Sequence, residues 1–187
     1  MNANAVIKVD KATFYRFIER QAEGYFEFVS GEIVRHMTGG TFDHSQITTD
    51  LVTTLRALLS RKEWAVSTQN RGVDTGETVR YPDVVVEAAG SARKTLSTSS
   101  PTLIVEVLSP STAELDLNTK PAEYTGLASL SAYVVVNQDR PELLVWQRDA
   151  NGRFPDAPAR IMGRDSILEI PALAIAVSLA SLYDSVN

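Results

Sequence analysis

Two carboxylates interrupt two apolar segments in the middle of the chain. Asp83 follows Pro82 and opens a run of three valines, and Glu106 lies inside a second apolar run over 103–108. Short β-branched runs bounded by Pro, Gly and Ser are typical of buried strands. A charged carboxylate in such a strand is costly unless a cation or a hydrogen-bond donor faces it. The pattern therefore predicts adjacent strands whose carboxylates share a positive partner.

A hard divalent cation is the partner that suits this spacing. If the two strands pair, Asp83, Glu106 and the carbonyl oxygen of Val107 can converge on Mg²⁺, or on Mn²⁺ in its place. Such an ion lowers the pKa of a bound water and offsets negative charge on a phosphoryl oxygen. Lys120 follows at a distance that allows it to stabilise the attacked phosphate or to orient the water.

A purely structural interpretation of the same residues stays open. Pro-Asp often begins a strand, and the segment 109–112, Ser-Pro-Ser-Thr, is an ordinary strand-to-helix turn. Asp116 and Lys120 are also spaced as a surface i,i+4 ion pair, which stabilises a helix by a few tenths of a kcal/mol. This interpretation predicts no metal and no chemistry.

A wider set of residues resembles a known family. The set comprises Tyr25-x-Glu27, Gly31-Glu32, His44, Pro82-Asp83, Glu106-Val107-x-Ser109-Pro110-Ser111-Thr112, Asp116, Lys120 and Tyr124. Together these residues resemble the Uma-two family of restriction-endonuclease-like proteins in the PD-(D/E)XK nuclease superfamily, over about residues 15–183. The resemblance implies a divalent-metal phosphodiesterase site with Asp83, Glu106 and Lys120 as catalytic residues.

The same resemblance points to accessory roles for His44, Glu27, Asp116 and Tyr124. His44 lies at the start of a predicted helix, where its side chain either packs within the protein or contributes to the site. Glu27 lies mid-strand between two phenylalanines and faces away from them, toward either solvent or the site.

One departure from the superfamily pattern concerns the lysine. That pattern places a lysine two residues after the glutamate, where this chain has Leu108, and Lys120 on the following helix matches the variant seen in this family. Pro121 follows Lys120 directly, and proline fits best in the first turn of a helix. The helix is therefore expected to begin near Thr119.

The surrounding elements predict an α/β fold. Hairpins are expected over 25–29 with 33–37 and over 132–136 with 143–147, and further strands over 64–68, 72–75 and 160–170. Helices are expected after caps at Thr13 and Asp43, the second continuing to about residue 61, and again over 178–183. This order favours a restriction-endonuclease-like mixed β-sheet flanked by helices, with added β-hairpins, in a single domain over 1–187.

Composition limits the class of protein. The chain has 187 residues, of which 44% are hydrophobic and 22% charged, with no cysteine and a net charge of −5. These values, with no signal peptide or membrane span in the pattern, favour a globular protein of the reducing cytoplasm. The acidic balance argues against broad electrostatic binding of nucleic acid. A local basic groove remains compatible with it, from Arg56, Arg61, Lys62, Arg71, Arg80, Arg93 and Lys94.

The functional prediction is a Mg²⁺-dependent DNA endonuclease that hydrolyses phosphodiester bonds with an activated water. The alternative is a nuclease-fold module, weak or inactive as a catalyst, that acts by binding nucleic acid or protein. Cutting both strands of a duplex needs two sites, so a homodimer is expected, formed through a hairpin edge or the segment 173–183.

Overall fold

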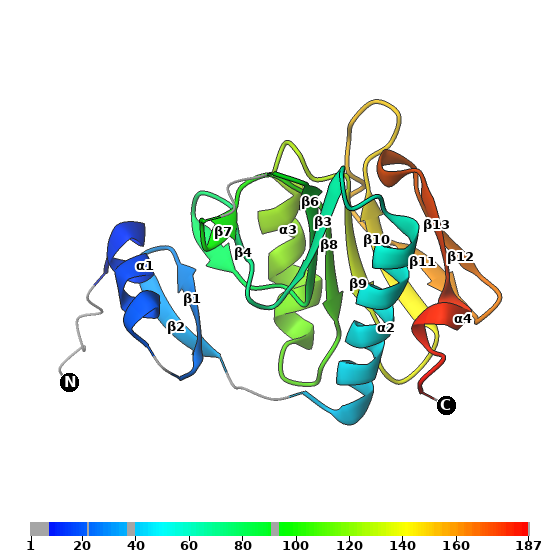
Figure 1. The fold of residues 1–187 in the computed structure, drawn as a ribbon, viewed down its shortest axis with the longest axis horizontal. Coiled ribbons are helices and arrows are strands. Elements are labelled where there is room, and N and C mark those ends of the chain that lie inside the picture. Colours follow the sequence, from blue (N-terminus) through cyan, green and yellow to red (C-terminus); the bar gives the residue numbers. More distant parts are fainter. Residues whose placement is uncertain (1–7, 22, 37–39, 91–93, 187) are drawn as a thin grey trace.

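The computed structural model of the chain describes residues 8–21, 23–36, 40–90 and 94–186. Its largest unit is a six-stranded mixed sheet with the strand order β11-β10-β9-β8-β6-β3 (Figure 1). The strands are β3 (Trp64–Thr68), β6 (Val84–Ala88), β8 (Pro101–Val107), β9 (Ala132–Val136), β10 (Glu142–Gln147) and β11 (Ala159–Met162). Only β8 and β9 run parallel in this sheet; the other neighbours are antiparallel.

Two smaller sheets extend this unit. A five-stranded sheet has the order β2-β1-β5-β4-β7, and β12 pairs with β13 in a two-stranded ribbon. Their strands are β1 (Tyr25–Val29), β2 (Glu32–His36), β4 (Gly72–Asp74), β5 (Thr78–Arg80), β7 (Ser97–Thr98), β12 (Ile167–Ile170) and β13 (Ile175–Ser178). The predicted α/β class, with mixed sheets, flanking helices and added hairpins, is confirmed.

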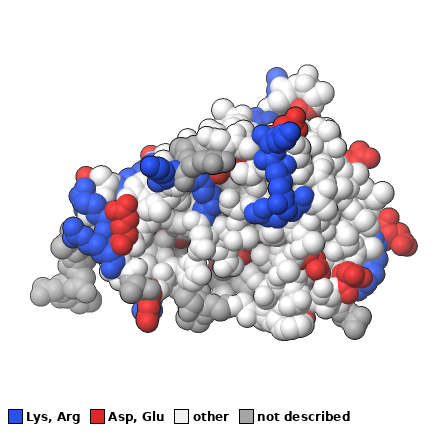
Figure 2. All heavy atoms as spheres, in the orientation of Figure 1, with Lys and Arg blue, Asp and Glu red and all other residues white. Residues whose placement is uncertain are grey.

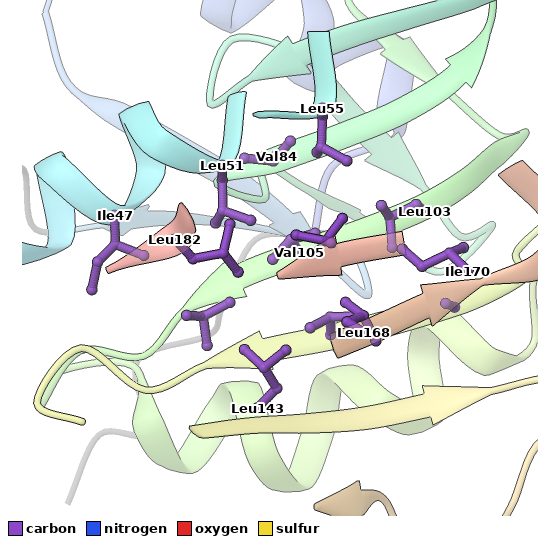
Figure 3. Close-up of a cluster of buried hydrophobic side chains, with 14 of the residues drawn as sticks. Ile47, Leu51, Leu55, Val84, Leu103, Val105, Leu143, Leu168, Ile170 and Leu182 are labelled. Carbon is purple, nitrogen blue, oxygen red and sulfur yellow. The ribbon is translucent and has the colours of Figure 1, made fainter. Parts of the chain in front are cut away.

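The two faces of the six-stranded sheet are covered by different helices. On one face, α2 (Phe42–Leu58) and α4 (Leu179–Leu182) pack over alternate residues of β6 and β8. Figure 3 shows side chains of α2 and α4 pointing toward Val84, Val105 and the β12 side chain of Leu168. On the other face, α3 (Lys120–Thr125) lies over Val85, Ile104 and the aromatic residues of β9 and β10. The central strands are therefore buried on both sides, as their continuous apolar runs predict.

The helix caps lie three and two residues before the predicted ones. Asp10, not Thr13, caps α1 (Lys11–Arg20) by accepting a hydrogen bond from the Thr13 backbone N–H at 2.7 Å. Thr41, not Asp43, caps α2 by accepting from the His44 N–H at 3.1 Å. In both cases the predicted cap lies inside the first turn, where its own backbone is already helical.

The segment around Lys120 forms a π-helical turn followed by α3. The turn spans Leu115–Thr119, and the Lys120 N–H donates to the Leu115 carbonyl five residues back. Lys120 itself is helical, with φ −60° and ψ −34°. In a regular α-helix the ring of Pro121 would clash with the carbonyl four residues earlier, and a wider π turn relieves that clash. The helical backbone runs from residue 113 through this turn into α3, so the helix begins earlier than the predicted Thr119. Pro121 does not displace Lys120 from it.

The C-terminal part departs from the prediction of one strand over 160–170. Two strands, β11 and β12, occupy this range, separated by a turn in which Gly163 has a φ of +94°. The two predicted hairpins form as β1–β2 and β9–β10. Met37, at the end of the first predicted hairpin, lies outside the described residues.

Within the described residues, none of the helices combines the length and the hydropathy that a bilayer crossing requires.

The packing of α2 gives a stability prediction with an internal control. Leu51 is 4% exposed in the core, whereas Leu58 on the same helix is 46% exposed. Leu51→Ala should lower the free energy of unfolding by about 2–5 kcal/mol because it leaves a cavity. Leu58→Ala should change it by about 0.5 kcal/mol or less. Urea unfolding followed by circular dichroism measures both; equal losses would contradict this assignment of the buried face.

Candidate active site

The predicted site residues line one cavity of about 530 Å³. Its walls come from β1 of the five-stranded sheet, from the start of α2, and from the ends of β6 and β8. Asp83, Glu106, Val107 and Lys120 all line it, together with Glu27 and His44. Asp116 and Tyr124 are buried beneath it and reach it through Lys120 and Glu106.

Pairing of β6 with β8 brings the two predicted metal ligands together. Val84 lies opposite Val105, and the same register puts Asp83 opposite Glu106. The Asp83 backbone N–H donates to Glu106 Oε2 at 3.3 Å, and the Val107 N–H donates to Asp83 Oδ2 at 2.8 Å. Val107 lines the same cavity as Asp83 and Glu106, so the three predicted ligand residues lie together.

Lys120 is buried between two carboxylates. Its Nζ donates to Glu106 Oε1 at 2.6 Å and lies 2.7 Å from Asp116 Oδ1. Asp116 is 1% exposed and Lys120 is 4% exposed, so the interpretation of this pair as a solvated surface contact is wrong. Burial lowers the pKa of Lys120, but the negative charges of Glu106 and Asp116 outweigh it and raise that pKa above its ordinary value.

Glu106 lies at the centre of this cluster. Burial raises its pKa to about 8; Lys120 opposes that shift, while the charges of Asp116 and Asp83 add to it. Tyr124 supplies a further, longer contact from its hydroxyl to Glu106 Oε1 at 3.5 Å. The Tyr124 ring packs edge-on against Tyr133, whose hydroxyl donates to the Asp116 carbonyl at 2.9 Å. These two buried aromatic rings form the floor of the site.

His44 contacts the other carboxylate. Its Nε2 lies 3.1 Å from Asp83 Oδ2, a position set by the cap of α2 at Thr41. The hydrogen bond to Asp83 raises the pKa of His44, with the backbone of Val107 acting in the same direction and burial opposing them. Asp83 also accepts a hydrogen bond from the Gln69 amide at 2.9 Å. Although burial favours its neutral form, these donors hold the pKa of Asp83 below its ordinary value.

Glu27 belongs to a separate ion network at the edge of the cavity. Its Oε2 accepts from Arg80 at 2.7 Å, and its Oε1 accepts from the Tyr81 backbone N–H at 3.2 Å. Arg80 also donates to both carboxylate oxygens of Glu123 on α3. Glu27 thus turns toward the site but is engaged by Arg80. Arg80 in turn is buried, so it is unavailable for the predicted basic groove.

The charge balance of the site suits a cation. Among the described residues that are fully buried here, Glu27, Asp83, Glu106 and Asp116 carry carboxyl groups, while Arg80 and Lys120 carry the opposing charge. A carboxylate has about four acceptor positions. Asp83 and Glu106 each accept from three donors in the described residues, which leaves each one further position.

The described residues contain no group of three or more His, Cys, Asp or Glu side chains arranged to hold a metal. Mg²⁺ does not require one, because it is commonly held by one or two carboxylates while it keeps several waters. The donor set of Asp83, Glu106 and the Val107 carbonyl therefore fits a hard cation.

Sequence reasoning missed several residues of the site. Gln69 and Tyr81 were missed because they are neutral side chains in connecting segments. Glu123 was missed because its sequence position is typical of an exposed helix residue. No local pattern distinguishes Gln69 from other loop residues. Arg80 offered a weak signal, since an arginine next to a predicted buried strand needs a carboxylate partner.

Comparisons with known proteins agree with these motifs. A family model named Uma2 and described as "Putative restriction endonuclease" matches residues 12–180. The uncharacterized proteins sll1609 and slr1290 of Synechocystis sp. are each 30% identical to this chain, over 139 and 148 residues. The first alignment covers 72% of this chain and 78% of the relative; the second covers 78% and 77%.

A solved structure shows the same fold. The crystal structure of "a putative nuclease belonging to DUF820" from Anabaena variabilis aligns with a TM-score of 0.69. It covers 90% of this chain and 95% of that chain at 15% sequence identity, which is evidence for the fold alone. The family model spans most of the chain and includes every residue that carried the resemblance. The protein therefore belongs to the Uma2 family.

Proposed function

We propose that this protein is a metal-dependent endonuclease that hydrolyses phosphodiester bonds in DNA through an activated water. The observation that carries the proposal is the convergence of Asp83, Glu106 and Lys120 in one open cavity. Membership of the Uma2 family, whose description is "Putative restriction endonuclease", supports it.

Asp83, Glu106 and the carbonyl of Val107 would hold Mg²⁺, or Mn²⁺ in its place. When bound, such an ion lowers the pKa of a water ligand and offsets negative charge on the phosphate oxygens. Lys120 places a positive charge beside Glu106, where it stabilises the charge that develops on the attacked phosphate. His44 and Gln69 orient the Asp83 carboxylate, and Asp116 and Tyr124 position Lys120 and Glu106.

A basic groove next to the site supports nucleic acid as the partner. Arg56 and Arg61 line a second cavity of about 610 Å³ along β3, the edge strand of the large sheet, and Arg71 lines it while paired with Glu87. Figure 2 shows Lys and Arg side chains gathered over the region between α2 and β3. Thr68 lines both this groove and the site cavity, so the two adjoin. Of the other predicted groove residues, Lys62 and Lys94 are exposed, and Arg93 lies outside the described residues.

One observation favours a second candidate, a nuclease-fold module that binds without catalysis. Asp83 accepts hydrogen bonds from His44, Gln69 and the Val107 N–H. Glu106 is likewise engaged by Lys120. Carboxylates that are bonded to protein donors in this way are compatible with a purely structural ion network.

Metal binding separates these two functions. Asp83→Asn and Glu106→Gln should each weaken Mn²⁺ binding by at least about tenfold, because a ligand oxygen loses its charge. The matched control is Glu142→Gln, which removes a buried carboxylate that pairs with Arg140 and Arg160 outside the cavity. Isothermal titration calorimetry measures all four proteins. Equal affinity of wild type and both site variants would refute the metal site.

Substitution of Lys120 tests the catalytic step separately from metal binding. Lys120→Met alone leaves two buried carboxylates unpaired, so the informative variant is Lys120→Met combined with Asp116→Asn, which removes both charges of that pair. At saturating metal this variant should nick supercoiled plasmid about 10²–10³-fold more slowly while it still binds Mn²⁺. Lys11→Met, which removes the ion pair with Asp74 outside the cavity, should leave nicking unchanged. Wild-type protein that binds Mn²⁺ but nicks no DNA would favour the binding module.

The proposed partner state is a homodimer, since two sites are needed to cut both strands of a duplex. In the C-terminal segment Leu173, Leu179 and Leu182 are buried within the subunit, whereas Ala174, Ala176, Ser178 and Ala180 are exposed. The other predicted surface is the hairpin edge at β2, which ends the five-stranded sheet. Light scattering at micromolar concentration should give twice the 20.5 kDa mass of one chain. A particle with the mass of one chain would count against the dimer.

A further inference from the structure

A smaller cavity opens directly beside the candidate active site. It has a volume of about 210 Å³ and lies between the end of α1, the start of β1 and the loop after β3. Four residues line both this cavity and the site cavity: Tyr25, Phe26, Gln69 and Tyr81. A chain molecule bound across the carboxylates can therefore place one of its groups here.

The lining of this cavity is aromatic and uncharged over most of its surface. Tyr25, Phe26 and Tyr81 supply three rings, Gln69 and Asn70 supply amide groups, and the remaining described residues are Ile18, Glu19, Gly24 and Leu96. No lysine or arginine is among them, so a phosphate group would find no cation there. A flat, uncharged ring with hydrogen-bonding edges matches this surface, since bases stack on aromatic side chains and bond with polar ones.

The aromatic wall is held in place before any ligand binds. The Phe26 ring packs edge-on against Phe17, with ring centroids 4.9 Å apart. The same ring approaches Gly24 so closely that a Cβ there would lie 2.9 Å from it, and Gly24 has a φ of +103°. Tyr25, next to it, is 43% exposed at the mouth of the cavity. The ring of Phe26 is therefore fixed, while that of Tyr25 is free to receive a partner.

We propose that this cavity, defined by Tyr25, Phe26, Asn70 and Tyr81, binds the nucleobase of the nucleotide adjoining the phosphodiester at the carboxylate site. The inference rests on the proposed function, which brings a nucleotide chain to Asp83 and Glu106. A base that is stacked and paired in a duplex cannot enter a side cavity without leaving the helix. The base therefore enters the cavity after it has flipped out of a duplex, or from a nucleotide that is already unpaired.

The test compares an oligonucleotide that has bases with one that lacks them. Fluorescence anisotropy with Ca²⁺ in place of Mg²⁺ measures binding of a short single-stranded DNA and of an equally long strand of abasic sugars. Tyr25→Ala should weaken binding of the base-bearing strand by about tenfold or more and leave the abasic strand unaffected. Tyr25→Trp, which keeps a stacking surface, should restore the affinity.

Two controls make the outcome specific. Phe42→Ala removes another exposed aromatic side chain, 71% exposed and outside both cavities, and should change neither affinity. A duplex with one unpaired nucleotide should bind more tightly than the fully paired duplex. An equal loss for both strands in Tyr25→Ala, or no loss for either, would overturn the base site.

The two proposals fail separately. If the protein nicks plasmid but binds the base-bearing and abasic strands equally, the endonuclease proposal is supported and the base site is refuted. If binding depends on the bases but no DNA is cleaved, the base site is supported and the catalytic assignment is refuted.

Discussion

The buried ammonium group of Lys120 is the interaction on which the rest of the site depends. It pairs with both Glu106 on β8 and Asp116 in the π turn, at contact distances of 2.6 and 2.7 Å. Removing one partner of such a buried pair leaves an uncompensated charge, which typically costs about 3–5 kcal/mol. The end of the central strand and the start of α3 are therefore held in one relative position, and the wider π turn before Pro121 allows that position.

The same physical logic recurs at the opposite wall. Arg80 on β5 ties Glu27 on β1 to Glu123 on α3, so a second buried cation joins the five-stranded sheet to the helix that carries Lys120. Each wall of the cavity is thus anchored by a cation between two carboxylates. Hydrophobic packing forms the strands, but these two charge clusters determine where polar atoms lie within them.

The parts of this structure that could be predicted are those with a local physical cause. Asp83 and Glu106 stand out because a carboxylate in a β-branched run needs a partner, and Gly31 marks the hairpin through its positive φ of +95°. The π turn could not be predicted, because it arises from burial of Asp116 and Lys120 together with the steric demand of Pro121. Gln69 and Tyr81 acquire roles only when the chain brings their loops to Asp83 and Glu27. The split between β11 and β12 did have a signal, Gly163, which one long strand cannot easily accommodate.

The attachment of β1 has a consequence for how such a protein diversifies. Strand β1 pairs with β5 at only two positions, Phe28 with Val79 and Val29 with Thr78, whereas its first residues pair with β2 alone. Tyr25 and Phe26 therefore belong to a rim that is constrained by local hairpin packing, while the carboxylate floor is constrained by charge balance. Exposed Tyr25 can therefore change at little cost in folding stability, and the buried charges of the floor cannot. Under the proposed function, ligand preference and chemistry are encoded in separately mutable parts of the chain.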